Sequence, residues 1–260
     1  MKNPFKARLK AGKPALGLML TLPSAQLAQV VARAGFDWLM IDREHGPIDI
    51  GACQAMIAAT QGTEAAPIVR IREIDPELAK PVLDAGAFGV IFPMVKTVEE
   101  AKLAVASLRY PPVGVRGIGP IMASVRWGLT AAEYLKVANE ELATVILIEH
   151  VDAVRNIRKI LAVKGIDVAQ IAPFDLSASL GRPGELEHRE VKKAIATAEA
   201  AILKSGVALG GLGQNPENAR KMIARGYRCI VMTHDVGLIQ TAAAGLLGPL
   251  GGGGVKHRGY

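Results

Sequence analysis

Short apolar runs, rich in β-branched residues, alternate along the chain with longer segments in which apolar residues recur at helical spacing. Runs of this length between turn residues are typical of strands in a parallel sheet that is covered on both faces. The predicted strands, in chain order, are Leu16–Leu20, Asp37–Ile41, Ile68–Ile71, Gly89–Met94, Val145–Ile148, Asp167–Ala172, Val207–Gly211 and Arg228–Met232.

Helical periodicity lies between these runs, and several of the helical segments end on a glycine suited to a left-handed C-cap. Eight strand–helix pairs in roughly 230 residues predict an α/β fold, a (β/α)8 TIM barrel, with a doubly wound sheet as the alternative. No linker interrupts the pattern, so residues 1–247 are expected to form one domain. The predicted helices are Ser24–Ala34, Ile48–Thr60, Asp75–Asp84, Thr97–Leu108, Ala131–Glu140, Val151–Leu161, Glu187–Lys204 and Pro216–Arg225.

Three further segments do not fit a strand–helix pair. Tyr110–Trp127 is an irregular stretch rich in Pro and Gly, and a loop of this length is typical of a functional or mobile element. Val236–Leu247 predicts a last helix that is apolar on more than one face, which indicates packing against another subunit. The Gly-rich residues 248–260 are expected to be a flexible tail.

Composition narrows the classes of partner. The 260 residues carry a formal net charge of +7, but only 4% are aromatic, so no stacking surface for nucleic acid is expected. The scattered basic excess favours a solvated surface that attracts small anions.

Membrane insertion and export are not expected. The uncharged stretch 236–255 contains seven glycines and so fits a helix followed by a loose tail better than a membrane span. The basic N-terminal segment has no apolar core of a signal peptide, and Cys53 and Cys229 lack the spacing of a zinc or redox site. These features predict a cytoplasmic protein with two buried thiols.

Polar side chains follow several of the predicted strands where each strand ends. In a parallel barrel these ends meet at one mouth, where reactive groups gather. The side chains expected at that mouth are Asp42, His45, Arg70, Glu149 and Asp175.

Glu149 and Asp175 end neighbouring strands without an obvious basic partner. Two such carboxylates would repel each other unless a cation lay between them, and oxygen ligands of this kind suit Mg²⁺ or Mn²⁺. The alternative is that each carboxylate caps the helix that follows it.

His45 follows Asp42 by three residues, a spacing that lets the carboxylate orient the imidazole as a general acid–base pair. A structural histidine in a strand-to-helix turn is the alternative. Arg70 ends a buried strand, and its guanidinium needs an anion, either a carboxylate ligand or an internal aspartate.

Other chemistry has weaker support in the sequence. Lys96 is the one strand-end lysine that could form a Schiff base, but it directly precedes a helix and is expected to be solvated. No phosphate-binding glycine motif follows a strand. Arg116, among glycines in VRGIGP, could cradle an acidic substrate tail or simply belong to a turn.

Six segments, in this order, resemble the HpcH/HpaI aldolase family over about residues 5–245: AGFDWLMIDREHGP, PIVRI, DAGAFGVIFPMV, YPPVGVRGIGP, IEHVDAVRNI and APFDLSASLG. The resemblance implies a homohexameric (β/α)8 barrel, a trimer of dimers with a swapped C-terminal helix. It also implies a class II aldolase that depends on a divalent metal ion (Mg²⁺, Mn²⁺ or Co²⁺). The implied substrates are pyruvate or a related 2-keto acid and an aldehyde, as in aldolases of aromatic or sugar acid catabolism that act on 4-hydroxy-2-oxoheptanedioate or 2-keto-3-deoxy sugar acids.

By this resemblance, Glu149 and Asp175 hold the metal ion, which chelates the keto acid. Arg70 stabilises the enolate oxygen, and His45, oriented by Asp42, moves the proton of the C4 hydroxyl.

The pocket departs from the family pattern. Leu147 stands where most members have a Gln, and Phe174 stands where a small residue is usual. Two alternatives therefore stay open: a related carbon–carbon lyase or synthase acting on oxaloacetate or acyl-CoA thioesters, and a non-catalytic keto-acid-binding protein. The further departures are Arg43, His150 and His234, and the residues expected to line the substrate site are Arg70, Leu147, Phe174, Asp175 and Leu212.

Overall fold

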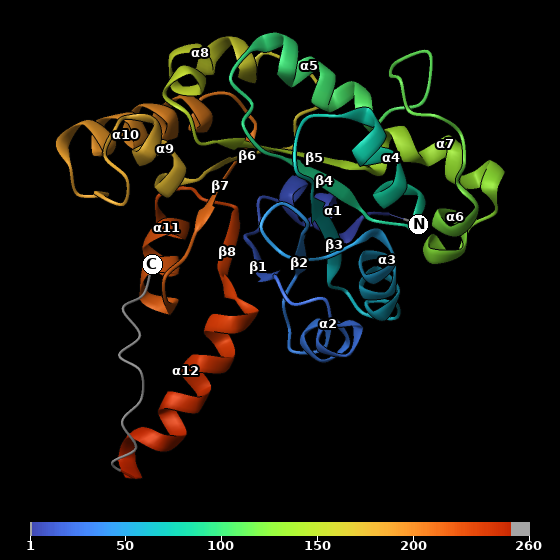
Figure 1. The fold of residues 1–260 in the computed structure, drawn as a ribbon. Coiled ribbons are helices and arrows are strands. Elements are labelled where there is room, and N and C mark those ends of the chain that lie inside the picture. The colour runs from blue at the N-terminus through green and yellow to red at the C-terminus, as the bar shows by residue number, and fades with distance from the viewer. Residues whose placement is uncertain (1, 251–260) are drawn as a thin grey trace.

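Eight parallel strands close into a barrel in the computed structural model, which describes residues 2–250 (Figure 1). They pair in chain order, and the last pairs with the first. The predicted (β/α)8 barrel is confirmed, and the doubly wound sheet is excluded because that sheet would be open. The strands are β1 (Ala15–Leu20), β2 (Trp38–Asp42), β3 (Ala66–Arg70), β4 (Gly89–Phe92), β5 (Ala143–Ile148), β6 (Val168–Ile171), β7 (Ala208–Leu212) and β8 (Cys229–His234).

The strands are buried on both sides because side chains fill the barrel and helices cover it. Every residue of β2 and β5 is buried, which explains why these strands read as continuous apolar runs. The helices are α1 (Pro4–Lys10), α2 (Ala25–Ala32), α3 (Ile50–Ala59), α4 (Pro76–Asp84), α5 (Val98–Ser107), α6 (Ile121–Trp127), α7 (Ala131–Glu141), α8 (Val151–Leu161), α9 (Pro173–Ser179), α10 (Arg189–Leu203), α11 (Pro216–Ala224) and α12 (Asp235–Leu247).

Two short helices, α1 and α6, were not predicted, and α9 was expected only as the helix that Asp175 would cap. The expectation of an irregular segment over Tyr110–Trp127 was wrong for its second half, which is α6. Its start, Pro120, provides no side-chain cap, so no local signal marks the helix. Tertiary packing holds it instead, because Trp127 is buried and stacks on Phe88 with ring centroids 4.4 Å apart.

Helix α1 packs across the amino-terminal ends of β4, β5 and β6. Asn3 caps the helix and its side-chain amide donates to the carbonyls of Phe88 and Glu141. Lys6 donates to the Leu142 carbonyl and pairs with Asp167 at 2.9 Å. Helix α1 therefore covers part of this end of the barrel, and the carboxyl-terminal end is left for the reactive groups.

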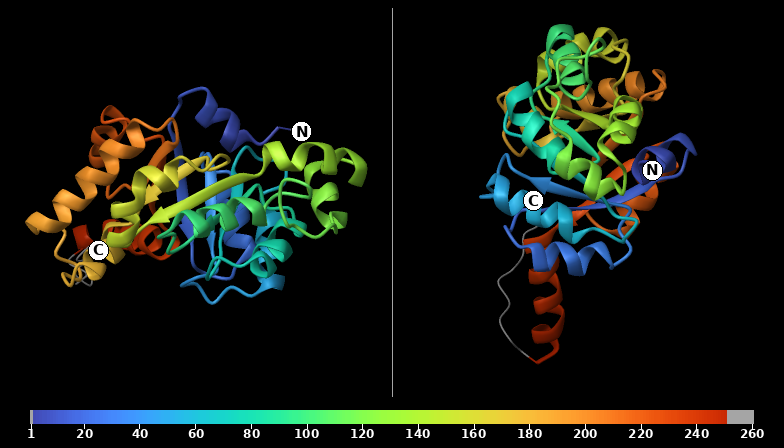
Figure 2. Two further views of the ribbon diagram at one scale, coloured as in Figure 1. Left: turned by 90° about the horizontal axis from the view of Figure 1, so that it is seen from above. Right: turned by 90° about the vertical axis from the view of Figure 1, so that its right-hand side faces the viewer.

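Helix α12 extends away from the barrel (Figures 1 and 2). Only Asp235 and Gly237, in its first turn, are buried, whereas Ile239 and Leu246 are 51% and 75% exposed. Among residues 2–250, no helix combines the length and apolarity that crossing a bilayer requires. Gly248–Leu250 forms a short 3-10 turn, and the rest of the predicted tail lies outside the described residues.

The two cysteines are free thiols in the core, as the sequence predicted. Burial raises the pKa of Cys53 to about 12 and also raises the pKa of Cys229. Neither thiol is therefore activated for chemistry.

Candidate active site

The polar residues predicted at the strand ends lie at one end of the barrel. Asp42 and Arg70 are the last residues of β2 and β3 and are in register with each other. Glu149 follows β5 directly, and Asp175 lies in the first turn of α9, just after β6. Because all eight strands run parallel, these positions share the carboxyl-terminal mouth.

Arg70 and Asp42 form a two-pronged ion pair. The guanidinium donates from Nε to Oδ1 of Asp42 at 2.9 Å and from Nη2 to Oδ2 at 2.8 Å. Asp42 is fully buried, and 12% of the Arg70 side chain is exposed. The anion that the sequence required for Arg70 is therefore an internal aspartate, which fixes the orientation of the guanidinium.

The surroundings of Arg70 favour the charged form of its guanidinium. Burial by itself lowers the pKa of the guanidinium, but the bonds to Asp42 and the nearby carboxylates outweigh it, so its pKa lies above the ordinary value. Its Nη1 lies 3.2 Å from Oε2 of Glu44. A permanent cation therefore stands at the mouth, held by two carboxylates.

Glu44 is a site residue that the sequence reasoning did not select. Its Oε2 is buried and accepts no hydrogen bond within the described part of the chain. Burial, together with the charges of Asp42 and Asp175, raises its pKa to about 7, against the lowering effect of Arg70. The signal was its place two residues after Asp42, at the same strand end.

Glu149 is 4% exposed and accepts a hydrogen bond from the backbone N–H of Met94. Met94 follows β4 and has a φ of 54°, a left-handed conformation that is uncommon for a side chain of this size. Burial raises the pKa of Glu149 to about 7, with further increases from Glu44 and Asp175. The strained backbone of Met94 thus aims a donor at a carboxylate that its surroundings make costly to ionise.

Helix capping does not account for either predicted metal ligand. His150, not Glu149, is the N-cap of α8, and its Nδ1 accepts from the Asp152 N–H. Helix α9 has Ala172 as its N-cap and no side-chain cap bond. The exposed Asp175 lies close enough to raise the pKa values of Glu44 and Glu149.

His45 lies at the rim, with 66% of its side chain exposed. Asp42 contacts His45 through the His45 backbone. Its Oδ1 accepts the backbone N–H of His45 at 3.3 Å and that of Glu44 at 3.0 Å. The carboxylate beside the imidazole is Glu44, with Oε2 3.6 Å from Nε2. Asp42 therefore shapes the turn that carries His45, and Glu44 is the group that can orient its ring.

The carboxylates fit a divalent cation. Glu149 and Asp175 supply two oxygen donors of the hard type that Mg²⁺ and Mn²⁺ prefer, which leaves room for water and substrate oxygens. Among residues 2–250, no three His, Cys, Asp or Glu side chains form a preformed metal cluster. Burial and, to a smaller extent, mutual repulsion between the carboxylates raise the pKa values of Glu44 and Glu149, and a cation among these groups would relieve that repulsion.

Apolar residues also lie near the ends of these strands. Leu147 is buried two residues before Glu149, while Phe174 and Leu212 are half-buried where β6 and β7 end. In β6, Gln170 is 3% exposed and has an unpaired Oε1. The sequence reasoning missed Gln170, because a lone glutamine in an apolar run gives no signal of its own.

The Arg116 guanidinium is held inside the protein and does not contribute to a substrate cradle, one of the two alternatives for this segment. It is 1% exposed, and it donates to Asp84 at 2.7 Å and to the Tyr134 hydroxyl at 3.1 Å. Arg116 thus anchors the VRGIGP segment, of which Val115 and Ile118 are exposed. Lys96 adjoins Thr97, the N-cap of α5, as the helix-start interpretation predicted.

The remaining departures from the family pattern have local structural partners. His234 is the N-cap of α12 and accepts the Gly237 N–H. Arg43 donates to the Ile48 carbonyl.

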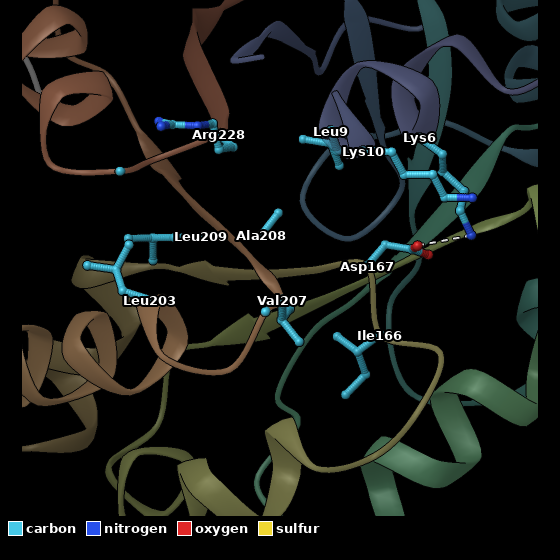
Figure 3. A pocket seen from close by; sticks show the side chains of 12 residues that line it. Lys6, Leu9, Lys10, Ile166, Asp167, Leu203, Val207, Ala208, Leu209 and Arg228 are labelled. Atoms are coloured by element: carbon cyan, nitrogen blue, oxygen red, sulfur yellow. Dashed lines mark ion pairs between the residues drawn. The ribbon is translucent and has the colours of Figure 1, made fainter. Parts of the chain in front are cut away.

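A basic cavity of about 350 Å³ lies at the opposite end of the barrel (Figure 3). It is lined by Lys6, Lys10 and Arg228 together with Asp167, and Lys6 and Asp167 neutralise each other. Because parallel barrels carry their reactive groups at the other end, this cavity is not assigned to the chemistry.

The fold and the mouth define a class of protein: a (β/α)8 barrel enzyme whose reactive end holds acidic residues, a fixed arginine and a histidine. Residues 15–242 match the family model of the HpcH/HpaI aldolase/citrate lyase. The chain belongs to this family, as the six sequence segments predicted.

Known relatives agree with this placement. A 4-hydroxy-2-oxo-heptane-1,7-dioate aldolase from Escherichia coli is 39% identical over 252 residues, which cover 96% of both chains. Among solved structures, an HpcH/HpaI aldolase/citrate lyase family protein from Burkholderia cenocepacia J2315 is 34% identical, with a TM-score of 0.90 over 96% of this chain and 99% of that one. The citrate synthase SbnG is 28% identical, with a TM-score of 0.85 over 95% and 96% of the two chains.

Proposed function

We propose that this protein is a class II aldolase. It cleaves a 4-hydroxy-2-oxo acid to an aldehyde and pyruvate or a related 2-keto acid, or forms the 4-hydroxy-2-oxo acid from them. The carrying observation is the placement of Glu149 and Asp175 opposite the Arg70–Asp42 pair at the mouth of a barrel of this family. A cation and a carboxylate cluster side by side are what a reaction through an enolate requires, because negative charge develops on the keto oxygen.

Glu149 and Asp175 are the residues that would hold a divalent metal ion, Mg²⁺, Mn²⁺ or Co²⁺. When bound, this ion supplies Lewis-acid polarisation of the substrate carbonyl. Arg70, a positive charge of the protein itself, then adds to the stabilisation of the negative charge on the keto oxygen.

Arg70 is the group that stabilises the enolate oxygen. Two of its five N–H donors are committed to Asp42, and Nη1 faces Glu44. The guanidinium is therefore fixed before substrate binds, and a fixed donor stabilises developing charge without a cost of reorganisation.

His45 is the group that moves the proton. Its exposed ring, beside Glu44, can remove the proton of the C4 hydroxyl as the C3–C4 bond breaks. The bond electrons pass to the enolate, the aldehyde leaves, and protonation at C3 gives the keto acid. Glu44 orients the ring in this scheme and is a positioning residue.

The apolar residues near the strand ends, Leu147 and Phe174, favour a second candidate function on the same fold. Leu147 and Phe174 place carbon where a polar pocket would bind a small hydrophilic nucleophile, and SbnG, a citrate synthase, shares the barrel. A carbon–carbon lyase or synthase acting on oxaloacetate or acyl-CoA thioesters is this candidate. A non-catalytic keto-acid-binding protein is the remaining alternative, which the exchange assay below distinguishes from an enzyme.

The oligomer and location complete the proposal. The apolar face of α12, of which Ile239 and Leu246 are exposed, supports assembly through this helix, and we propose a homohexamer. A cytoplasmic location fits the two free thiols.

Deuterium exchange into the methyl group of pyruvate tests the aldolase proposal without knowledge of the aldehyde. The purified protein is followed by proton NMR in D₂O with Mg²⁺, Mn²⁺ or Co²⁺ and again with EDTA. Metal-dependent exchange that is lost in Arg70→Ala supports the proposal. Absence of exchange in folded, metal-loaded protein contradicts it, and turnover of oxaloacetate or an acyl-CoA then supports the second candidate.

A further inference from the structure

Gln170 holds a polar atom without a partner inside an otherwise apolar strand. The residue is 3% exposed, and its Oε1 is buried and without a hydrogen bond among the described residues. Its neighbours in β6, Ala169 and Ile171, are buried and apolar. Buried amide groups are nearly always hydrogen-bonded, so an amide oxygen without a protein partner indicates a partner that is absent from the chain itself.

The side chain of Gln170 points into the barrel. In β7, a Cβ added to Gly211 would lie 2.9 Å from the Met222 side chain of α11, so Gly211 faces the outer helices. Strand residues alternate, so Gly210 faces inward. A Cβ on Gly210 would lie 3.0 Å from the Cβ of Gln170, its register partner, and the two residues therefore share the inner face.

The level of Gln170 along the barrel axis also brings its side chain toward the acidic residues at the mouth. It is in register with Leu147 of β5, which is two residues before Glu149. Two strand residues span about 7 Å, and the side chain of glutamine covers much of that distance. The side chain of Gln170 can therefore extend toward the level of Glu149 from the neighbouring strand.

We propose that Gln170 binds the 2-keto acid, by donating a hydrogen bond from its side-chain amide to an oxygen of the substrate. This inference rests on the proposed function and adds a specificity-determining residue to it. A half-turn of the terminal amide exchanges N and O, so the NH₂ group can face the ligand. A 2-keto acid carries only acceptor oxygens, which matches this donor.

The position has a consequence for selectivity. Leu147, on the neighbouring strand, offers no polar atom at this height, so the only amide on the inner face of the β5–β6 pair comes from β6. The keto acid would therefore be oriented from the β6 side. The rival explanation is that a trapped water satisfies Gln170 and that the residue serves only the core.

The test compares Gln170→Leu with wild type by the pyruvate exchange assay and by thermal unfolding. Leucine has nearly the same volume but no amide. We expect the KM for pyruvate to rise about ten- to hundredfold, with a smaller change in kcat, because one hydrogen bond to a charged ligand is lost. The unfolding midpoint should not fall, because an unpaired buried polar group is removed.

A matched double variant, Leu147→Gln with Gln170→Leu, moves the amide to the adjacent strand at the same height. Recovery of the KM supports the proposal even if Gln170→Leu lowers the unfolding midpoint. A raised KM with an unchanged midpoint also supports it. An unchanged KM in Gln170→Leu overturns it, as does a raised KM that accompanies a lowered midpoint and is not recovered by the double variant.

Failure of the proposed function is recognised separately. If wild type shows no exchange, binding of pyruvate and oxaloacetate is measured by calorimetry in both proteins. Weaker binding of either acid to Gln170→Leu supports the role of Gln170 without aldolase activity. Equal binding, or no binding to wild type, overturns it.

Discussion

Arg70 and Asp42 lie side by side at the ends of β3 and β2, joined by two hydrogen bonds of 2.9 and 2.8 Å. The pair links two strands at the mouth and fixes a cation close to Glu44 and Glu149. Since Asp42 is fully buried and also accepts the N–H groups of Glu44 and His45, it connects the charge of the site to the shape of the His45 turn.

Asp42→Ala is expected to destabilise the protein by about 3–5 kcal/mol, because it leaves a buried guanidinium without its main partner. The free energy of unfolding in urea measures this loss. Arg33→Ala on the exposed surface of the barrel is the control, with an expected change within about 0.5 kcal/mol. A loss below about 1 kcal/mol in Asp42→Ala would show that Glu44 alone can hold Arg70.

Arg70→Lys is expected to lower the rate of pyruvate exchange by about a hundredfold or more. Lysine keeps the charge but cannot form the two-pronged bond to Asp42, so the cation is no longer fixed where the enolate oxygen develops. The initial rate of deuterium incorporation at saturating pyruvate gives the comparison. A rate within a factor of three of wild type would mean that position matters little and charge alone suffices.

The stability of the metal-free protein is expected to fall as pH rises from about 4.5 to about 7. Burial raises the pKa of Glu44 and Glu149 to about 7, whereas the unfolded chain titrates near 4.5. In this window the folded protein binds more protons than the unfolded chain, and stability decreases with pH. Thermal midpoints in EDTA between pH 5 and pH 8 measure the effect.

Glu149→Gln isolates this contribution, because glutamine keeps an acceptor for the Met94 N–H but does not titrate. The fall with pH should be smaller in the variant than in wild type. In wild type, Mn²⁺ should raise the midpoint more at pH 8 than at pH 5, since a cation binds the ionised carboxylates. Identical pH profiles for the two proteins would contradict the raised pKa of Glu149.

Ile239→Glu, on the exposed face of α12, is expected to shift the protein from the proposed hexamer to smaller particles. A carboxylate placed in an apolar contact would have to be desolvated on assembly. Sedimentation velocity measures the particle size. Gln240→Glu adds the same charge at the neighbouring exposed position and is the control, so equal dissociation in both variants would argue for simple charge repulsion.

The barrel was predictable because its signals are local. Continuous apolar runs such as β2 and β5, and helix starts such as Ser24 and Thr97 with side-chain caps, are set by neighbours in sequence. The short helix α6 was not, because it depends on the packing of Trp127 against Phe88, 39 positions earlier in the chain.

For the site, the sequence by itself determined which side chains reach the mouth, because strand polarity alone carries Asp42, Arg70 and Glu149 to one end. Only the tertiary structure decided their partners. The register between β2 and β3 pairs Arg70 with Asp42, and the turn that follows β2 places Glu44 beside His45. Whether a buried amide such as Gln170 finds a partner depends on atoms from other strands, and no periodicity within one strand encodes that.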